Sequence, residues 1–411
     1  MSDNAPTGGA VVASTLVTPV GRRPPRGRAL GEPQVLGESG LVWNERGEIV
    51  YVGPADGLPF EDPEVFQGCT IVPGFVDGHT HLPFFGWRAD EFETRLAGAT
   101  YRDLHGEGGI YRSARLLADA NDQEVLAFCR PLVREMANHG TTSLELKTGY
   151  GLSVEGELRQ ARLARALAEE APQTCTVTLL ACHAVPKGME PREWVRAACD
   201  ELIPVAAAEG LADAVDVYVE DIAFTVEDLR AVAEAAEAAG LPLRCHADQL
   251  GPSGAAEVAV ALGARSADHL NNASPEGIRA LGGGETVALL LPASTLLVGG
   301  TPPAARAMIA AGAPIALASD FNPGTSPVLS MPEVVALGCS LYRLSPHEAL
   351  VAATLGPAWV LGLAERSGSL ETGKHADFLV LDGDAFRQVP YRPGHNPVVH
   401  TYIEGRRVGG R

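Results

Sequence analysis

Apolar runs alternate with stretches rich in Ala, Glu and Arg through the middle of the chain. The typical helical stretches are 113–139, 154–170 and 226–239, the last ended by Gly240 as a C-terminal cap. The alternation implies a parallel sheet, and eight strands favour a closed (β/α)8 TIM barrel over the competing open doubly wound sheet. The expected strands are 71–81, 141–147, 175–183, 214–220, 242–247, 266–269, 286–291 and 314–320.

Both ends of the chain carry shorter strand-like pieces separated by turn residues, at 39–43 and 48–53 and again at 376–382 and 398–405. We therefore predict a small β-sandwich domain built from both termini, residues 1–68 and 363–411, and a barrel domain of residues 69–362. Residues 1 to about 30, rich in Pro, Gly and Arg, are expected to form an irregular lead-in.

The composition excludes several classes of partner. A formal net charge of -19 argues against nucleic acid and against an anionic membrane, since both require basic patches. An anionic substrate would need a locally placed cation. The 7 Cys are scattered, as expected for free thiols in a reducing compartment, and neither a signal peptide nor an apolar membrane span is evident. We expect a cytoplasmic protein.

Polar residues end nearly every expected strand, where a barrel carries its catalytic groups. They are His79 and His81, Glu145 and Lys147, His183, Glu220, His246, His269, and Asp320. Three imidazoles and a carboxylate, from His79, His81, His246 and Asp320, suit one Zn or Fe ion with a position left for water. Alternatively, each is a satisfied polar residue at a strand end, and Asp320 caps the turn that follows it. His269 is either a further ligand or a group that polarises the substrate carbonyl.

Residues 73–81 resemble the first-strand signature of the amidohydrolase superfamily, and Asp320 and the terminal strands fit the same pattern. Within it, further motifs are similar to those of the imidazolonepropionase family of histidine degradation. These are residues 79–88, 92–98, 108–110, 147–152, 183–186, 246–248, 266–270 and 320–325. The resemblance extends over roughly residues 66–380.

The resemblance implies hydrolysis of the ring amide of 4-imidazolone-5-propanoate to N-formimidoyl-L-glutamate by a metal-activated water, in a homodimer. It implies metal ligands at His79, His81, His246 and Asp320, and catalytic roles for Asp320, His269 and Gln249. The implied substrate contacts are Arg88, Tyr101, Tyr150, His183, Gln249, Asn322, Gly324 and Thr325.

Arg88 has a physical reason to be among these contacts, because a guanidinium grips a carboxylate with two hydrogen bonds. A surface ion pair with Asp90 or Glu91 is the alternative. The two tyrosines, Tyr101 and Tyr150, could equally be core residues.

The sequence departs from the family pattern in two places. Gln249 stands where relatives often carry Glu, so proton transfer would fall to Asp320 or His269. Tyr111 and Arg112 follow residues 108–110, where relatives tend to have smaller residues, and could alter specificity.

Other functions stay open at this point. Lys147 could be a carbamylated bridge between two metals, although we favour one metal. A related hydrolase or deaminase acting on another cyclic amide or heterocycle is the nearest alternative function. A catalytically inactive barrel protein is the more distant one.

Overall fold

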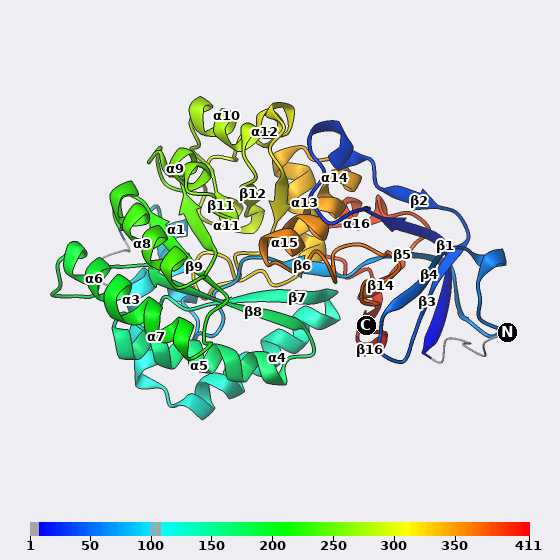
Figure 1. Ribbon diagram of the computed structural model, residues 1–411, viewed down its shortest axis with the longest axis horizontal. Coiled ribbons are helices and arrows are strands. Elements are labelled where there is room, and N and C mark those ends of the chain that lie inside the picture. The colour runs from blue at the N-terminus through cyan, green and yellow to red at the C-terminus, as the bar shows by residue number, and fades with distance from the viewer. Residues whose placement is uncertain (1–7, 100–102, 104–107) are drawn as a thin grey trace.

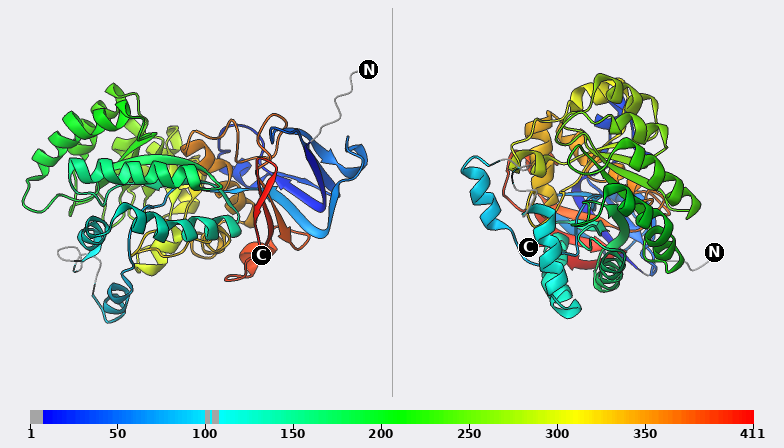
Figure 2. Two further views of the ribbon diagram at one scale, coloured as in Figure 1. Left: turned by 90° about the horizontal axis from the view of Figure 1, so that it is seen from below. Right: turned by 90° about the vertical axis from the view of Figure 1, so that its left-hand side faces the viewer.

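The computed structural model describes residues 8–99, 103 and 108–411 of the chain. Two β-sheets lie one after the other along the longest axis, and most of the helices gather around one of them (Figure 1). In the left view of Figure 2, the N-terminal and C-terminal strands lie together at the end away from these helices.

Eight parallel strands form the first sheet, which runs in sequence order from β6 to β13. Thr80 and Phe321, beyond the ends of the two outer strands, form a parallel bridge, so the sheet curls into a nearly closed barrel. The expected (β/α)8 barrel is confirmed. The strands are β6 (Phe75–Asp77), β7 (Thr141–Lys147), β8 (Thr174–Cys182), β9 (Ala214–Val219), β10 (Leu243–Ala247), β11 (Ser266–His269), β12 (Val287–Leu290) and β13 (Ile315–Leu317).

The expected first strand, residues 71–81, is divided between the two sheets. Its first residues belong to β5 (Glu64–Pro73), which lies in the other sheet, and β6 ends at Asp77. At Gly74 between them a Cβ would lie 2.1 Å from Thr142 Oγ1, so glycine lets the chain pass. His79 and His81 therefore lie on irregular chain beyond β6. The pattern could not show this, because the run is apolar throughout.

Helices surround the barrel and connect its strands. Helix α5 has the expected bounds, and α8 ends one residue early, followed by Gly240 with φ +70°. No helix within the described ranges is both long and apolar enough to cross a membrane. The helices are α1 (Ala89–Leu96), α3 (Gly109–Asp119), α4 (Asp122–Asn138), α5 (Val154–Glu170), α6 (Pro191–Ala197), α7 (Ile203–Ala208), α8 (Val226–Ala238), α9 (Ala255–Ala261), α10 (Pro275–Gly283), α11 (Pro292–Leu297), α12 (Ala305–Ala311), α13 (Met331–Tyr342), α14 (Pro346–Ala352), α15 (Leu355–Val360) and α16 (Gln388–Tyr391).

The expected helix over residues 113–139 is two helices, α3 and α4. The break lies at Asn121, whose side chain accepts a hydrogen bond from Glu124 N while the Glu124 carboxylate accepts one from Asn121 N. This reciprocal capping box begins a new helix, and it was visible in the sequence as an Asn followed three residues later by Glu.

Strands from both termini form the second sheet, as predicted, in the order β16-β15-β14-β5-β1-β3-β4, with β2 paired to β1. The expectation of an irregular N-terminal lead-in is wrong for residues 9–18, which form β1 between β5 and β3. Alternating small and β-branched residues here are flanked by Gly and Pro, which concealed the strand. The other bounds are β1 (Gly9–Thr18), β2 (Gln34–Leu36), β3 (Ser39–Trp43), β4 (Ile49–Pro54), β14 (Phe378–Asp382), β15 (Val398–Ile403) and β16 (Arg406–Gly409).

Candidate functional site

A small cavity lies at the carboxyl ends of the barrel strands and collects most of the predicted site residues. Its lining is His81, Arg88, Ile110, Tyr150, His183, Tyr218, His246, Gln249, His269, Asp320, Asn322 and Thr325. Among the predicted residues, His79 lies fully buried beside this lining, and Gly324 packs against Arg88. Tyr101 lies outside the described residues.

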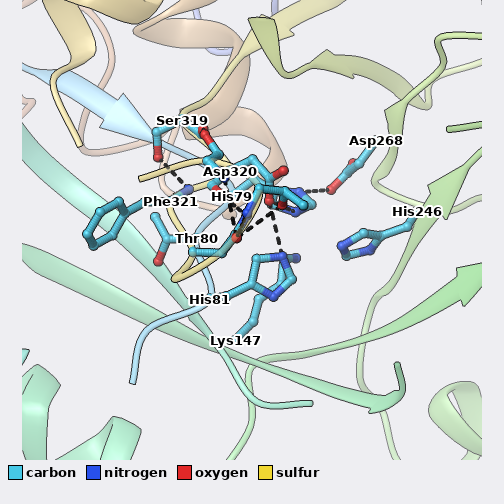
Figure 3. Close-up of polar contacts among 12 residues, drawn as sticks. His79, Thr80, His81, Lys147, His246, Asp268, Ser319, Asp320 and Phe321 are labelled. Carbon is cyan, nitrogen blue, oxygen red and sulfur yellow. Dashed lines mark hydrogen bonds and ion pairs between the residues drawn. The ribbon is translucent and has the colours of Figure 1, made fainter. Parts of the chain in front are cut away.

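The imidazoles and the carboxylate expected to bind metal meet at one point (Figure 3). Asp320 Oδ1 lies 3.2 Å from His81 Nε2 and 3.6 Å from His79 Nε2. The ring of His246 is 4.5 Å from that of His79, centre to centre. The His269 ring lies 5.3 Å from that of His246. These four residues lie far apart in the sequence but converge, because each lies at or just beyond the carboxyl end of a strand in one barrel.

Three nitrogens of these imidazoles lack a hydrogen-bond partner within the described part of the chain. They are His79 Nε2, His81 Nδ1 and His246 Nε2, and all three are buried. A buried polar atom without a partner costs about 1–3 kcal/mol, so such atoms point to a missing ligand. Nitrogen from imidazole and oxygen from carboxylate are the donors that Zn and Fe accept. The site therefore fits a metal ion.

A chain of three residues fixes the orientation of His79. Its Nδ1 lies 2.6 Å from Asp268 Oδ2, and this oxygen accepts a hydrogen bond of 3.0 Å from Arg244 Nη2. Because Nδ1 is engaged with the carboxylate, Nε2 is left to face Asp320. We call Arg244, Asp268 and His79 the arginine chain.

A second chain holds His246 in the same way. Its Nδ1 lies 3.1 Å from the Asp216 carboxylate, and Lys147 Nζ lies 2.7 Å from Asp216 Oδ2. We call Lys147, Asp216 and His246 the lysine chain. Such carboxylate–histidine pairs are typical around protein metal ions, because they fix the tautomer and orientation of the ligand. Lys147 is completely buried and does not line the cavity.

Sequence reasoning gave no role to Asp216, Arg244 or Asp268. The signal was nevertheless present. Asp216 is a lone carboxylate inside an apolar strand, and Arg244 precedes His246 by two residues, so strand alternation puts both side chains on the same face. The neighbouring Cys245 faces the opposite way and packs into the apolar core, as alternation predicts.

Burial decides the charge state of the imidazoles. It lowers the pKa of His81 and lowers those of His79 and His183 well below the ordinary value, because the charged form loses its water. The pKa of His269 falls to about 3 for the same reason. These rings are therefore neutral near pH 7, and a neutral imidazole is the form that binds metal.

Asp320 is ionised despite its burial. Desolvation alone would raise its pKa, but the hydrogen bond with His81 and the electrostatic interactions with His269 and His81 outweigh it, and the pKa is lowered. The backbone of Asp320 is left-handed, with φ +54°, which turns the carboxylate toward the histidines.

The Arg88 guanidinium lies on the cavity wall, and the side chain is only 3% exposed. Its Nη1 donates to Ser113 Oγ at 2.9 Å and to Gly109 O, and its Nε lies 3.3 Å from Glu91 Oε2. Gly324 sits against it so closely that a Cβ there would lie 1.7 Å from Nη2. The ion pair with Glu91 that stood as the alternative exists, but it is buried, and it fixes a cation that also faces the cavity.

Tyr150 and His183 line the cavity side by side, with ring centres 5.4 Å apart. Glu157 on α5 holds the loop of Tyr150, since its carboxylate accepts from the backbone N–H of Gly149 at 2.8 Å and of Gly151 at 2.7 Å. Gly149 O lies 3.0 Å from His183 Nδ1, which leaves His183 Nε2 as the other ring nitrogen available to a ligand.

Residues 320–326 form a tight turn around Asn322. Its Oδ1 accepts hydrogen bonds from the backbone N–H groups of Gly324 and Thr325, at 2.9 and 2.7 Å, and its Nδ2 donates to Asp320 O at 2.7 Å. Asn322 thus shapes the turn that presents Asp320 and the wall near Arg88.

The two departures from the family pattern lie in different places. Gln249 lines the cavity, and its loop is held by Glu220, whose carboxylate accepts from Leu250 N at 2.8 Å. Tyr111 and Arg112 do not line it: Tyr111 donates to Val185 O at 2.8 Å, and Arg112 Nη1 lies 2.6 Å from an Asp90 oxygen.

Comparisons with known proteins agree with this geometry. Residues 70–408 match the amidohydrolase family. Imidazolonepropionase from Rubrobacter xylanophilus is 44% identical over 389 residues, which cover 92% of this chain and 92% of that protein. Imidazolonepropionase from Geobacillus kaustophilus is 40% identical over 382 residues, 90% of each chain.

Solved structures resemble this one in fold. 5-Methylcytosine deaminase from Klebsiella pneumoniae superposes with a TM-score of 0.74 at 16% identity, covering 98% of this chain and 97% of that one. Adenosine deaminase from Xanthomonas campestris, solved with bound zinc, gives 0.72 at 18% identity, covering 98% and 93%.

Proposed function

Because this chain belongs to the amidohydrolase family and, within it, to the imidazolonepropionases, we propose that it hydrolyses the ring amide of 4-imidazolone-5-propanoate to N-formimidoyl-L-glutamate. One observation carries the choice of substrate. The buried Arg88 guanidinium shares a small cavity with the histidine–aspartate cluster. The cluster supports hydrolysis, and the cation supports a substrate that carries a carboxylate.

The site binds a divalent metal ion, as its family and its candidate ligands indicate. We propose that His79, His81, His246 and Asp320 hold a single Zn or Fe ion. When bound, such an ion lowers the pKa of water toward about 7 and polarises a carbonyl oxygen.

The remaining steps fall to side chains of the cavity. Asp320, ionised, takes a proton from the attacking water and passes it to the leaving ring nitrogen. His269, neutral because burial lowers its pKa to about 3, donates an N–H to the oxyanion that develops on the carbonyl. The Gln249 amide hydrogen-bonds the ring but cannot move a proton.

Substrate orientation comes from other residues of the cavity wall. Arg88 would bind the propanoate, and Ser113 and Glu91 hold its guanidinium in place. Tyr150 and His183 would contact the ring from the side, and the 322–325 turn would close the wall behind the carboxylate. Fixing both ends of the substrate positions the ring amide beside Asp320.

A deaminase acting on a neutral heterocycle is the nearest alternative, and the solved structures of similar fold include deaminases. A neutral base does not need a buried cation on the cavity wall, so Arg88 favours the propanoate. An inactive barrel protein is disfavoured by three buried imidazole nitrogens of the cluster that lack a hydrogen-bond partner in the described chain.

The deciding experiment is a hydrolysis assay with imidazolone propanoate beside its neutral propanamide analogue, hydantoins and lactams. We expect turnover of the propanoate. Arg88→Ala should raise its KM by about 10- to 150-fold, since hydrogen bonds to charged groups contribute about 1.5–3 kcal/mol, and should change KM for the propanamide little. Arg130→Ala, which removes an exposed partner of Glu170, is the matched control. Turnover of only the other rings would overturn the substrate, and an unchanged KM in Arg88→Ala would overturn its role.

The family resemblance also leads us to propose a homodimer in the cytoplasm. Light scattering on protein eluting from a size-exclusion column tests the dimer. The mass of a monomer at micromolar concentration would contradict it.

A further inference from the structure

We propose that Glu145 on β7 is a positioning residue for the metal centre, because it couples the arginine chain to the lysine chain. Its Oε2 lies 2.8 Å from Lys147 Nζ, and its Oε1 accepts hydrogen bonds from Arg244 Nη1 and Thr178 Oγ1. One carboxylate thus touches the cation of each chain.

Glu145 acts at a distance from the reacting atoms. Neither it nor Lys147, Asp216, Arg244 or Asp268 lines the cavity, and each of the five is at most 1% exposed. They form a charged layer inside the barrel, below the histidines. Any effect of Glu145 on the site must therefore pass through the histidines that the two chains orient.

Geometry explains why this third carboxylate is needed. Lys147 has a flexible stem, and an ammonium paired only with Asp216 could swing to a different oxygen of that group. Contact with Glu145 on the same strand fixes the ammonium from a second side. Arg244 is fixed likewise, with Nε donating to Ser266 Oγ at 3.1 Å and Nη2 donating to Gly78 O at 2.7 Å.

Charge gives a second reason. The layer holds the two cations Lys147 and Arg244 and the three carboxylates Glu145, Asp216 and Asp268, which together carry one excess negative charge. Opposite charges attract strongly where water is excluded, so this excess favours a divalent cation on the far side of His79 and His246. Without the charge of Glu145 the layer is neutral, and that attraction is lost.

The test is Glu145→Gln in the full-length protein, with Zn²⁺ affinity measured by competition against a chromophoric chelator. We expect affinity to fall by about 10- to 100-fold, the range seen when groups behind metal ligands are removed. KM for imidazolone propanoate, measured at saturating Zn²⁺, should stay within about twofold, because Arg88 and the cavity wall are unaltered. Wild-type Zn²⁺ affinity in a folded Glu145→Gln protein would overturn the inference.

Glu157→Gln is the matched control, since this carboxylate is equally buried but holds the Tyr150 loop. It should raise KM and leave Zn²⁺ affinity within about twofold. An equal loss of affinity in both variants would mean that burial of any charge matters, and would overturn a specific role for Glu145.

Circular dichroism of the metal-free proteins shows whether each variant folds. If Glu145→Gln does not, Thr178→Val removes one hydrogen bond from Glu145 at constant shape and charge. It should weaken Zn²⁺ binding several-fold, and unchanged affinity would overturn the inference. The inference rests on the metal site of the proposed function and not on its substrate: a wild-type protein that binds Zn²⁺ but leaves imidazolone propanoate intact would refute the substrate alone.

Discussion

Backbone strain at single residues marks the rim of the barrel. Asp248, His269 and Asp320 have left-handed φ values of 52°, 77° and 54°. Non-glycine residues in strained backbone regions cost about 1–3 kcal/mol each, and such strain concentrates at functional sites. For His269 and Asp320 the strained backbone accompanies side chains in the cavity wall, whereas the Asp248 carboxylate accepts hydrogen bonds from Ser253 and shapes a loop.

His269 has two possible roles, donor to the oxyanion or metal ligand, because its ring is close enough to His79 and His246 to bind the same ion. We expect His269→Asn, whose side chain tolerates left-handed φ, to lower kcat by about 10²–10³-fold, the usual loss of one oxyanion donor. Metal content should remain one equivalent by elemental analysis. Loss of metal along with activity would instead make His269 a ligand.

Glu220 gives a pH-dependent prediction. Burial raises its pKa from 4.5 to about 7, so the folded state holds this proton more tightly than the unfolded chain does. Its contribution to stability is full below about pH 4.5 and is lost as pH rises through about 7. Glu220→Gln keeps an acceptor for Leu250 N but carries no titrating proton. On going from pH 4.5 to pH 8, its free energy of unfolding should therefore rise by about 1–2 kcal/mol relative to that of the wild type.

Urea unfolding at both pH values measures this difference. Glu227→Gln, on the exposed face of α8, is the matched control and should show no pH-dependent gain. If Glu220→Gln and the wild type differ in free energy of unfolding by the same amount at both pH values, the raised pKa of Glu220 is contradicted.

At the scale of elements, helices outside the barrel hold the loops that line the cavity. Helix α5 supplies Glu157 and Gln160, whose side chains bind backbone N–H groups of the 149–152 loop. Helix α3 supplies Ser113 and the Gly109 carbonyl to Arg88. Helix α5 therefore fixes the position of the 149–152 loop, and helix α3 fixes the position of Arg88.

The start of α4 provides a prediction at this scale. Asn121→Ala removes the capping box that separates α4 from α3, and loss of such a cap costs about 1 kcal/mol. We expect a lower midpoint in urea with kcat and KM unchanged. Gln123→Ala, exposed within α4, should alter the free energy of unfolding by less than about 0.5 kcal/mol. Equal stability of Asn121→Ala and wild type would contradict the role of the cap.

For the whole molecule, the N-terminal strand joins the two ends of the chain. β1 pairs with β5 in parallel and with β3 in antiparallel orientation, and β5 in turn pairs with β14 near the C-terminus. β5 also leads directly into β6 and the histidines. The second sheet is thus linked to the site through Gly74 and the short strand β6, which His79 follows closely.

We therefore expect that a protein lacking residues 1–18 does not fold into a soluble form. The deletion leaves β5 and β3 without their common partner and exposes the apolar face that β1 buries. Deletion of residues 1–7 leaves β1 whole and is the control. Soluble yield and thermal unfolding by circular dichroism are the measurements. A shortened protein that unfolds at the wild-type temperature would show that β1 is dispensable.

The sequence by itself determined the barrel, the second sheet and the residues at the strand ends, because strand periodicity and strand-end chemistry are local properties that each segment carries alone. It could not show that Ile71 and Phe75 lie in different sheets, or that residues 9–18 are a central strand, since these depend on partners far along the chain.

Only the tertiary structure decided which polar residues meet. Asp216, Arg244 and Asp268 lie on three strands, and their contacts with His246 and His79 exist only after the barrel closes. Arg88 shows the same limit. Its sequence neighbours left a surface ion pair open as the alternative to a substrate contact, whereas folding buries it with Glu91 on the cavity wall. Spacing along a strand fixes the face of a side chain, but the curvature of the sheet fixes its neighbours.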